Sequence, residues 1–266
     1  MSTKRIYALF VRQFYLIRDN PTRLIQIFGW VLFDIILWGF LSRYIGHLAG
    51  DTTNFTPVFL GAVLLWYFAT RSMHGVATAF FEDMWSRNFL NLFASPLSVG
   101  EYTASLVLTG VTTSVMGFLA MLVIAKFLFG FTLVAYGVYV PLFLLIIFLS
   151  GIALGILGTA IVLRYGPSAE WFVWPIPEMI SPFIGVYYPL AILPQWLQWF
   201  AYLLPPSYVF ENIRVVLSGG VASLPSLIGA SVLSLIYCFF AYFYFTRVYK
   251  KSVQIGLIAR YSSESF

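Results

Sequence analysis

Two ionisable residues, Asp34 and Arg71, stand inside long apolar stretches of the sequence. A charge at the middle of a bilayer costs on the order of 3 kcal/mol or more, so such residues usually pair or line a cavity. At 1.5 Å per residue, Asp34 lies about 17 Å and Arg71 about 21 Å from the same side of their stretches. The similar depths predict an Asp34–Arg71 ion pair, within one subunit or between two. The pair would either clamp two helices together or open as they separate.

Further ionisable residues accompany this pair. His74 lies one helical turn beyond Arg71, and Glu178 lies at a similar height in a later apolar stretch. They predict a second polar pair or a cytoplasmic entrance to a path, while a simple packing role for His74 is the alternative. Cys238 is the single cysteine, so a disulfide within the chain is excluded. The histidines and this cysteine lack ligand spacing, and we expect no metal site.

A third polar pair ends the stretch "YYPLAILPQWLQWFAYLLPPSYVFENIR", residues 187–214. Glu211 and Arg214 are three residues apart and therefore share one helical face. They would either brace this segment or form a ring at an outer exit. Trp196 and Trp199 in the same stretch are typical of a membrane interface.

The composition indicates whether these residues lie in water or in a membrane. The 266 residues are 61% hydrophobic and 9% charged, with a mean hydropathy of +0.89, whereas a soluble domain has roughly 25% charged residues. The chain is therefore predicted to be an all-α integral membrane protein of one domain. Its net charge of +5 sits mostly near the two ends, which fits the positive-inside rule better than binding to nucleic acid.

Six transmembrane helices are expected from the apolar stretches. The N-terminal segment 1–20 mixes basic and apolar residues at helical spacing, which is typical of a helix lying in the membrane surface. Ser98 and Glu101 form a capping-box pattern, and Gly151, Gly155 and Gly158 mark a close-packing face. The expected spans are residues 24–46, 57–80, 100–125, 138–163, 170–188 and 226–246.

An even number of spans places both termini on one side of the membrane. With that side cytoplasmic, eleven of the 15 Lys and Arg residues lie inside and three lie outside, while Arg71 lies within a span. This bias predicts cytoplasmic termini. Residues 189–217 then lie on the outer side, where four prolines divide them into pieces too short to cross about 30 Å of hydrocarbon. We expect two re-entrant helices, about 194–204 and 206–217.

This order of elements resembles the membrane (permease) subunit of the ABC-2 type, or type V, ABC exporters. The stretches that carry the resemblance are "EDMWSRNFLNLFASPLSVGEY", residues 82–102, and residues 187–214 quoted above. The first is similar to a short helix before a small-Pro-small turn, and the second to a broken re-entrant pair with a Glu-x-x-Arg ending. The resemblance covers nearly the whole chain. It implies a single transmembrane domain, residues 1–266, with an interface helix at 1–20, a coupling helix at 82–96 and the re-entrant helices at 189–217.

The resemblance implies that the coupling helix docks into a partner ATPase, with the N-terminal helix as a second contact. An interfacial helix that only rests on lipid head groups is the alternative. Buried aromatic anchors with charged edges suit such an interface. The coupling residues implied are Glu82, Asp83, Trp85, Arg87, Phe89, Leu90, Phe93, Arg5 and Arg12.

The family also implies a homodimer with two copies of a separate ATPase. The sequence has no Gly-Lys dipeptide and hence no nucleotide-binding P-loop, so ATP and Mg would be bound by the partner chain, with no cofactor here and no catalytic residue. Further partners are membrane lipids, and the expected location is a bacterial or archaeal plasma (inner) membrane. The substrate is a hydrophobic, amphipathic or lipid-linked molecule, with a lipid-linked polysaccharide or teichoic-acid-type glycan as the alternative. An ion-gradient-driven transporter is disfavoured because only one broken segment is present, and an intramembrane enzyme because no convergent catalytic set is found.

Overall fold

The computed structural model describes residues 2–18, 21–48, 55–86, 88, 91–92 and 95–255. Within these ranges the ordered elements are helices. The six long ones are α1 (Thr3–Arg18), α2 (Pro21–Leu48), α3 (Phe55–Trp85), α5 (Val99–Phe129), α6 (Val140–Tyr165) and α11 (Leu224–Gln254).

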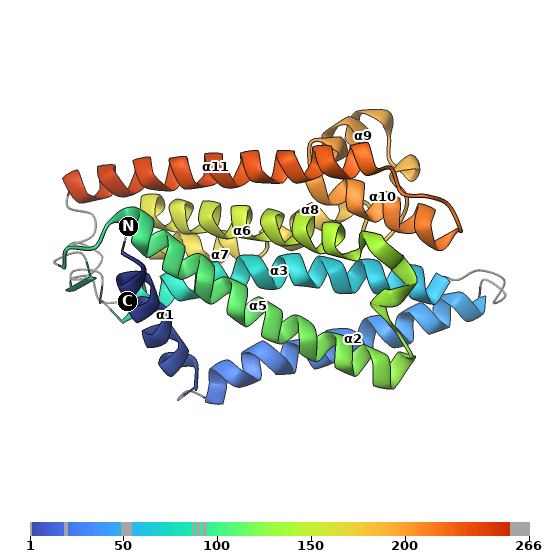
Figure 1. The fold of residues 1–266 in the computed structure, drawn as a ribbon, viewed down its shortest axis with the longest axis horizontal. Helices are drawn as coiled ribbons and strands as arrows, with labels where there is room; N and C mark the ends of the chain where they lie inside the picture. Colours follow the sequence, from blue (N-terminus) through green and yellow to red (C-terminus); the bar gives the residue numbers. More distant parts are fainter. Residues whose placement is uncertain are drawn as a thin grey trace.

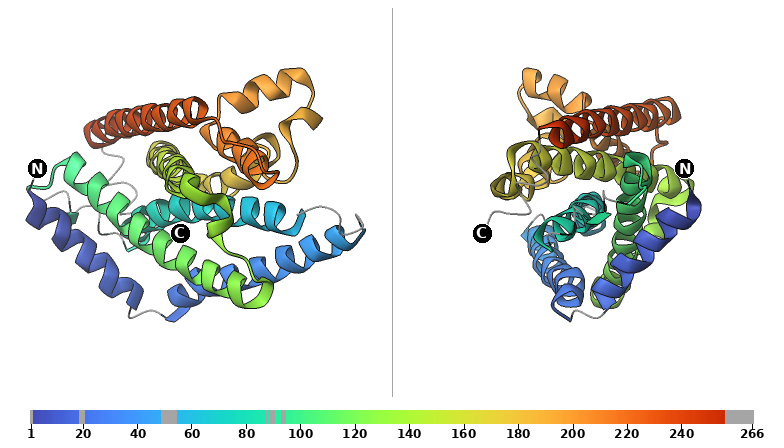
Figure 2. Two further views of the ribbon diagram at one scale, coloured as in Figure 1. Left: turned by 45° about the vertical axis from the view of Figure 1, so that its right-hand side comes forward. Right: turned by 90° about the vertical axis from the view of Figure 1, so that its left-hand side faces the viewer.

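The long helices form an up-and-down bundle (Figure 1). α3 packs between α5 and α6, α11 packs on α6, and α2 packs on α3 and α5. α11 and α2 therefore lie on opposite sides of the bundle in all three views (Figures 1 and 2). The end of α3, the start of α5 and the end of α11 share one end of the bundle with α1, which we call the α1 end. The opposite end carries α9 (Gln195–Tyr202) and α10 (Pro205–Leu217) and is called the α9 end.

Three helical stretches of the described chain are long and apolar enough to cross a membrane, namely Val99–Phe129, Leu133–Tyr165 and Leu224–Gln254. The second of these includes a 3-10 helix, η1 (Leu133–Tyr139), ahead of α6. The predicted all-helical membrane architecture is therefore confirmed. The full set of six spans stays a prediction.

Local sequence signals decide where α5 begins and ends. The Ser98 side chain accepts a hydrogen bond from the Glu101 backbone N–H at 3.2 Å, and the Glu101 carboxylate accepts one from the Ser98 N–H at 3.0 Å. The predicted capping box is thus confirmed. Gly130 ends the helix with a φ of 67°, a left-handed conformation that glycine adopts without steric penalty.

The glycine face of α6 packs against α3 as predicted. A Cβ on Gly151 would lie 2.4 Å from the carbonyl oxygen of Ala69, and one on Gly155 would lie 2.9 Å from that of Met73. Both distances are shorter than van der Waals contact. The two backbones can therefore approach this closely only because these positions lack side chains.

The fifth expected span is not a continuous helix. Residues 170–188 instead contain α7 (Glu170–Val173), α8 (Ile176–Ile180) and a 3-10 turn, η3 (Ser181–Phe183), followed by turns. The prediction of one helix here was wrong because Pro175, Pro177 and Pro182 each remove a backbone donor and clash with the preceding turn.

α9 and α10 occupy nearly the ranges expected for the broken segment, 194–204 and 206–217. The Tyr237 hydroxyl donates a 2.7 Å hydrogen bond to the Leu203 carbonyl, at the elbow between them. Tyr237 is thirteen residues into α11, or about 20 Å from its start. The elbow therefore lies far along α11 rather than at its end.

The boundary predicted for the coupling helix also needs correction. α3 continues to Trp85, so residues 82–85 form its last turn and the start of segment 82–96 is not a separate helix. Residues 81–84 are buried there, which explains why the helix continues: Phe81 and Met84 complete the apolar core at the α1 end.

Candidate functional site

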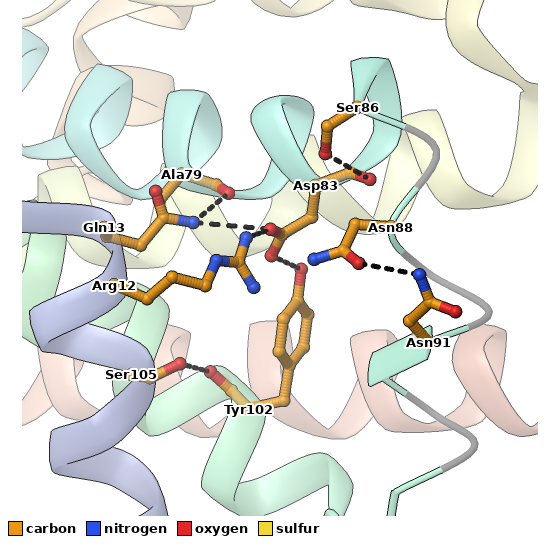
Figure 3. A network of polar contacts seen from close by, with 9 residues as sticks. All are labelled: Arg12, Gln13, Ala79, Asp83, Ser86, Asn88, Asn91, Tyr102 and Ser105. Carbon is orange, nitrogen blue, oxygen red and sulfur yellow. Dashed lines mark hydrogen bonds and ion pairs between the residues drawn. The ribbon is translucent and has the colours of Figure 1, made fainter. Parts of the chain in front are cut away.

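Asp83 joins three helices at the α1 end. Its carboxylate accepts a 2.9 Å hydrogen bond from the Tyr102 hydroxyl of α5 and pairs with Arg12 of α1 (Figure 3). Gln13 donates to the Ala79 carbonyl at 3.1 Å and reaches the same carboxylate at 3.5 Å. Asp83 is 1% exposed, so these contacts replace the water that its charge has lost. We call Arg12, Gln13, Asp83 and Tyr102 the Asp83 cluster.

A second set of contacts holds the start of α1. The Ser2 backbone N–H donates to the Glu101 carboxylate at 2.6 Å, and the Arg5 guanidinium lies 3.5 Å from its other oxygen. Arg5 also donates to the Pro96 carbonyl. α1 is thus fixed at two points, one on α3 and one on the start of α5.

The roles expected for the acidic pair change accordingly. Glu82 and Asp83 were predicted to be charged edges of a docking helix, but both are buried, at 6% and 1% exposure. Arg12 was predicted to contact the ATPase, but its guanidinium forms an ion pair with Asp83 within the chain. Burial lowers the pKa of Arg12 while Tyr102 and Glu82 raise it, and a guanidinium in this position keeps its charge near neutral pH.

Trp85, the last residue of α3, contacts α7. Its indole N–H donates to one oxygen of Glu170 at 3.0 Å, and the Trp174 indole donates to the other oxygen at 3.0 Å. Trp85 remains 51% exposed, so an apolar face is still open for contact. Four other predicted coupling residues lie outside the described residues: Arg87, Phe89, Leu90 and Phe93.

The charges predicted to lie within the membrane are near one another, halfway along α2 and α3. Asp34 accepts a hydrogen bond from Tyr67 and interacts electrostatically with Arg71. The Tyr67 hydroxyl in turn accepts a 3.0 Å hydrogen bond from the Trp38 indole. The side chain of Arg71 also passes α5, because a Cβ on Gly117 would lie 3.4 Å from its Nε. Direct pairing of Asp34 with Arg71 stays a prediction.

His74 and Glu178 have different neighbours. The His74 ring lies 3.4 Å from the Trp174 carbonyl and packs edge-on against the Trp174 ring at 4.8 Å. Glu178 interacts electrostatically with Asp34 and Tyr67 instead. Three charged residues, Asp34, Arg71 and Glu178, therefore share one region, and Glu178 is exposed on the surface of the single chain.

Glu211 and Arg214 tie α10 to the preceding turns. Arg214 donates to Glu211 at 3.0 Å and to the carbonyls of Gly185 and Val186. The Glu211 carboxylate also accepts the Leu190 backbone N–H at 3.0 Å. These contacts are those of a brace between α10 and residues 185–190.

The tryptophans of α9 point away from the bundle. Trp196 and Trp199 are each 68% exposed. Their faces are thus free to contact lipid or another subunit.

Comparison with known families decides what kind of protein this is. Residues 4–218 match the ABC-2 type transporter family, which covers most of the chain and both stretches singled out in the sequence. The chain belongs to this family. It is thus a multi-pass membrane permease without its own nucleotide-binding domain, and membership implies an ABC ATPase partner. A search of curated proteins finds no match.

Several residues of these sites could not be singled out from the sequence. Nothing in the sequence distinguishes Tyr67 and Tyr102 from the other tyrosines. Their role is seen only in the structure, where their hydroxyls donate hydrogen bonds to Asp34 and Asp83. Glu170 offered one local signal, because it lies four residues before Trp174 and side chains at that spacing meet on a helix. Its contact with Trp85 spans 85 positions and has no local signature.

Proposed function

We propose that this permease is the membrane half of an ATP-driven exporter, in which two copies form the pathway and two ATPase subunits bind ATP and Mg. The substrate is a hydrophobic, amphipathic or lipid-linked molecule that moves from the cytoplasmic side outward. The α1 end is cytoplasmic in this proposal, because the Lys and Arg residues gather there. The membrane is a bacterial or archaeal plasma membrane.

The observation that carries the proposal is the attachment of α1 to the last turn of α3. The Asp83 cluster makes α1, α3 and the start of α5 move as one body at the end where residues 86–96 would meet an ATPase. A push on that segment then reaches α3, and α3 carries Arg71 and Tyr67. ATP-driven docking works as a switch when it favours one arrangement of these helices over another.

The surface with Asp34, Arg71 and Glu178 supports a pathway between two copies. Exposed or half-exposed charges at this depth are tolerated where they face a wet cavity or a partner. Substrate would pass along this surface and leave beside α9 and α10. The brace formed by Glu211 and Arg214 would hold that exit in shape.

A lipid-linked glycan is the second candidate substrate. It requires a continuous wet channel, whereas an amphipathic molecule can enter sideways from the bilayer. The aromatic ring of Tyr187 stacks on Trp38 with centroids 5.3 Å apart beside the charged region, and such rings suit either substrate. An ion-gradient mechanism is disfavoured, since family membership implies an ATPase.

Co-purification tests the proposal. The permease is co-expressed with an ABC ATPase encoded beside it, and ATP-dependent extrusion of a lipophilic dye from vesicles is measured. We expect a complex of two permeases and two ATPases. A Trp85→Ala plus Phe89→Ala variant should lose most ATPase binding and transport, because interface aromatics carry most of the binding free energy.

The matched control is Trp199→Ala, which removes an exposed tryptophan at the α9 end and should leave ATPase binding unchanged. If no ATPase co-purifies and the double variant transports normally, the proposal is wrong.

A further inference from the structure

A cavity of about 530 Å³ lies beside α11. α11 itself lies on the side of the bundle away from α2 (Figures 1 and 2). α6 and α11 supply most of its wall, and the elbow residues Leu204, Pro205 and Pro206 close one end. The lining is almost entirely apolar and includes no carboxylate among the described residues. The neighbouring face of α11 is exposed, so the cavity opens toward the bilayer. Its lining includes neither Asp34 nor Arg71.

One lining residue, Trp66, carries a buried polar atom without a partner among the described residues. The Trp66 side chain is 2% exposed, and its indole Nε1 has no hydrogen-bond acceptor among the residues that the structure describes. A buried donor without an acceptor costs about 1–3 kcal/mol. Its ring is held edge-on against Phe210, with centroids 6.3 Å apart, so it belongs to the fixed core. Because the nitrogen itself is buried, a ligand oxygen would satisfy this N–H only after a small shift of the side chains between it and the cavity.

The other end of the cavity is basic. Arg247 lines it, and its guanidinium carbon lies 4.4 Å from the centroid of the Phe243 ring. Arg164 approaches from α6 and donates to the Tyr244 hydroxyl at 3.0 Å, beside Arg247. Lys250 and Lys251 follow Arg247 on the same helical face. Such a cluster beside an apolar groove attracts an anionic head group.

We propose that this cavity binds a single-chain lipid anion from the bilayer, with its acidic group at Arg247 and an oxygen within its apolar chain at the Trp66 indole N–H. Arg247 and Tyr237, which both line the cavity, are ten residues or about 15 Å apart along α11, a length that suits one lipid chain. In the proposed orientation of the permease Arg247 lies at the cytoplasmic face, so the lipid would come from the inner leaflet. In this respect alone the inference rests on the proposed function.

The bound lipid would stabilise one position of the elbow. Leu204, Pro205 and Pro206 contribute to the cavity, and Tyr237 anchors the elbow through the Leu203 carbonyl. The chain of the lipid would therefore contact the base of α10.

Three probes test the site on the purified permease in detergent, without any ATPase: stearate, a stearate with a mid-chain ketone, and stearyl alcohol. Binding is measured by isothermal titration. The wild type should bind the keto acid about fivefold more tightly than stearate, because one hydrogen bond is gained. Stearyl alcohol should bind at least tenfold more weakly than stearate, since it lacks the charge-assisted contact.

Two variants separate the two contacts. Trp66→Phe keeps a ring but removes the N–H, and it should bind stearate as before while losing its preference for the keto acid. Arg247→Gln should weaken both acids to the level of the alcohol. Arg43→Gln, which removes a guanidinium stacked on Phe129 elsewhere in the chain, is the matched control and should change nothing.

The inference is overturned if the wild type does not discriminate between the two acids, if Trp66→Phe still prefers the keto acid, or if Arg247→Gln still prefers acids to the alcohol. Unchanged stearate binding by Trp66→Phe shows that this variant is folded. Because binding is measured without the ATPase, its failure leaves the transport proposal intact. Conversely, if no ATPase co-purifies with the permease and the Trp85 plus Phe89 variant transports normally, the transport proposal fails while the lipid-binding result stands.

Discussion

At the scale of single residues, Asp83 makes the most consequential contacts in the chain. Its two carboxylate oxygens serve a cation from α1 and a hydroxyl from α5 while the side chain stays buried in α3. Neither partner is close in sequence: Arg12 is 71 positions away and Tyr102 is 19. The sequence predicted that Asp83 and Arg12 matter at this end, but their mutual contact depends on how three helices converge.

Asp83→Asn should destabilise the permease by on the order of 2–3 kcal/mol, because Arg12 then loses the counterion of a mostly buried pair. The expected result is a lower melting temperature in detergent and faster protease cleavage after α1. Tyr102→Phe removes one hydrogen bond and keeps the ion pair, so it should cost about 1 kcal/mol. A larger loss for Tyr102→Phe than for Asp83→Asn would contradict this ranking.

At the scale of elements, short sequence patterns predicted the features that depend only on neighbouring residues. The capping box at Ser98, the close-packing glycines of α6 and the approximate ranges of α9 and α10 could all be inferred from short patterns. The division of residues 170–188 was not predicted, because the apolar character of the stretch indicated one continuous span. The extension of α3 to Trp85 was missed as well, since the burial of Glu82 and Asp83 depends on distant helices.

Gly155 provides a test of the α3–α6 packing. Gly155→Ala should destabilise the bundle by about 1–3 kcal/mol, because its Cβ would lie 2.8 Å from Val76 Cβ. Gly229→Ala in α11 is the matched control, since nothing lies within 4 Å of a Cβ there. Melting temperatures of the two variants in detergent provide the comparison. Equal effects would mean that helix propensity rather than packing determines the result.

At the scale of the whole molecule, the charged region is incomplete in one copy. Glu178 is exposed on α8, and Met179 beside it is 67% exposed. A bilayer does not tolerate such a surface without water or a partner. This surface is therefore where we expect the second copy of the permease to lie.

Cysteine cross-linking tests this arrangement, because Cys238→Ser removes the single native thiol. Met179→Cys in that background should form a disulfide-linked dimer in membranes under mild oxidation. Leu235→Cys, 55% exposed on α11, should not. The readout is the dimer band on a non-reducing gel. A dimer formed through position 235 alone would mean that the second copy packs on α11, which contradicts the arrangement expected at Glu178 and Met179.

The short pieces α7 and α8 also bear on how the chain is made. Four or five helical residues cover only about 6–8 Å, and the backbone groups at the breaks cannot be left in hydrocarbon. This stretch therefore cannot leave the insertion machinery into lipid alone, as α5 and α6 can. It has to be held until α10 has been synthesised, because Glu211 and Arg214 of α10 bind the backbone of the turns that follow α8. Residues 170–217 would then enter the membrane as one unit.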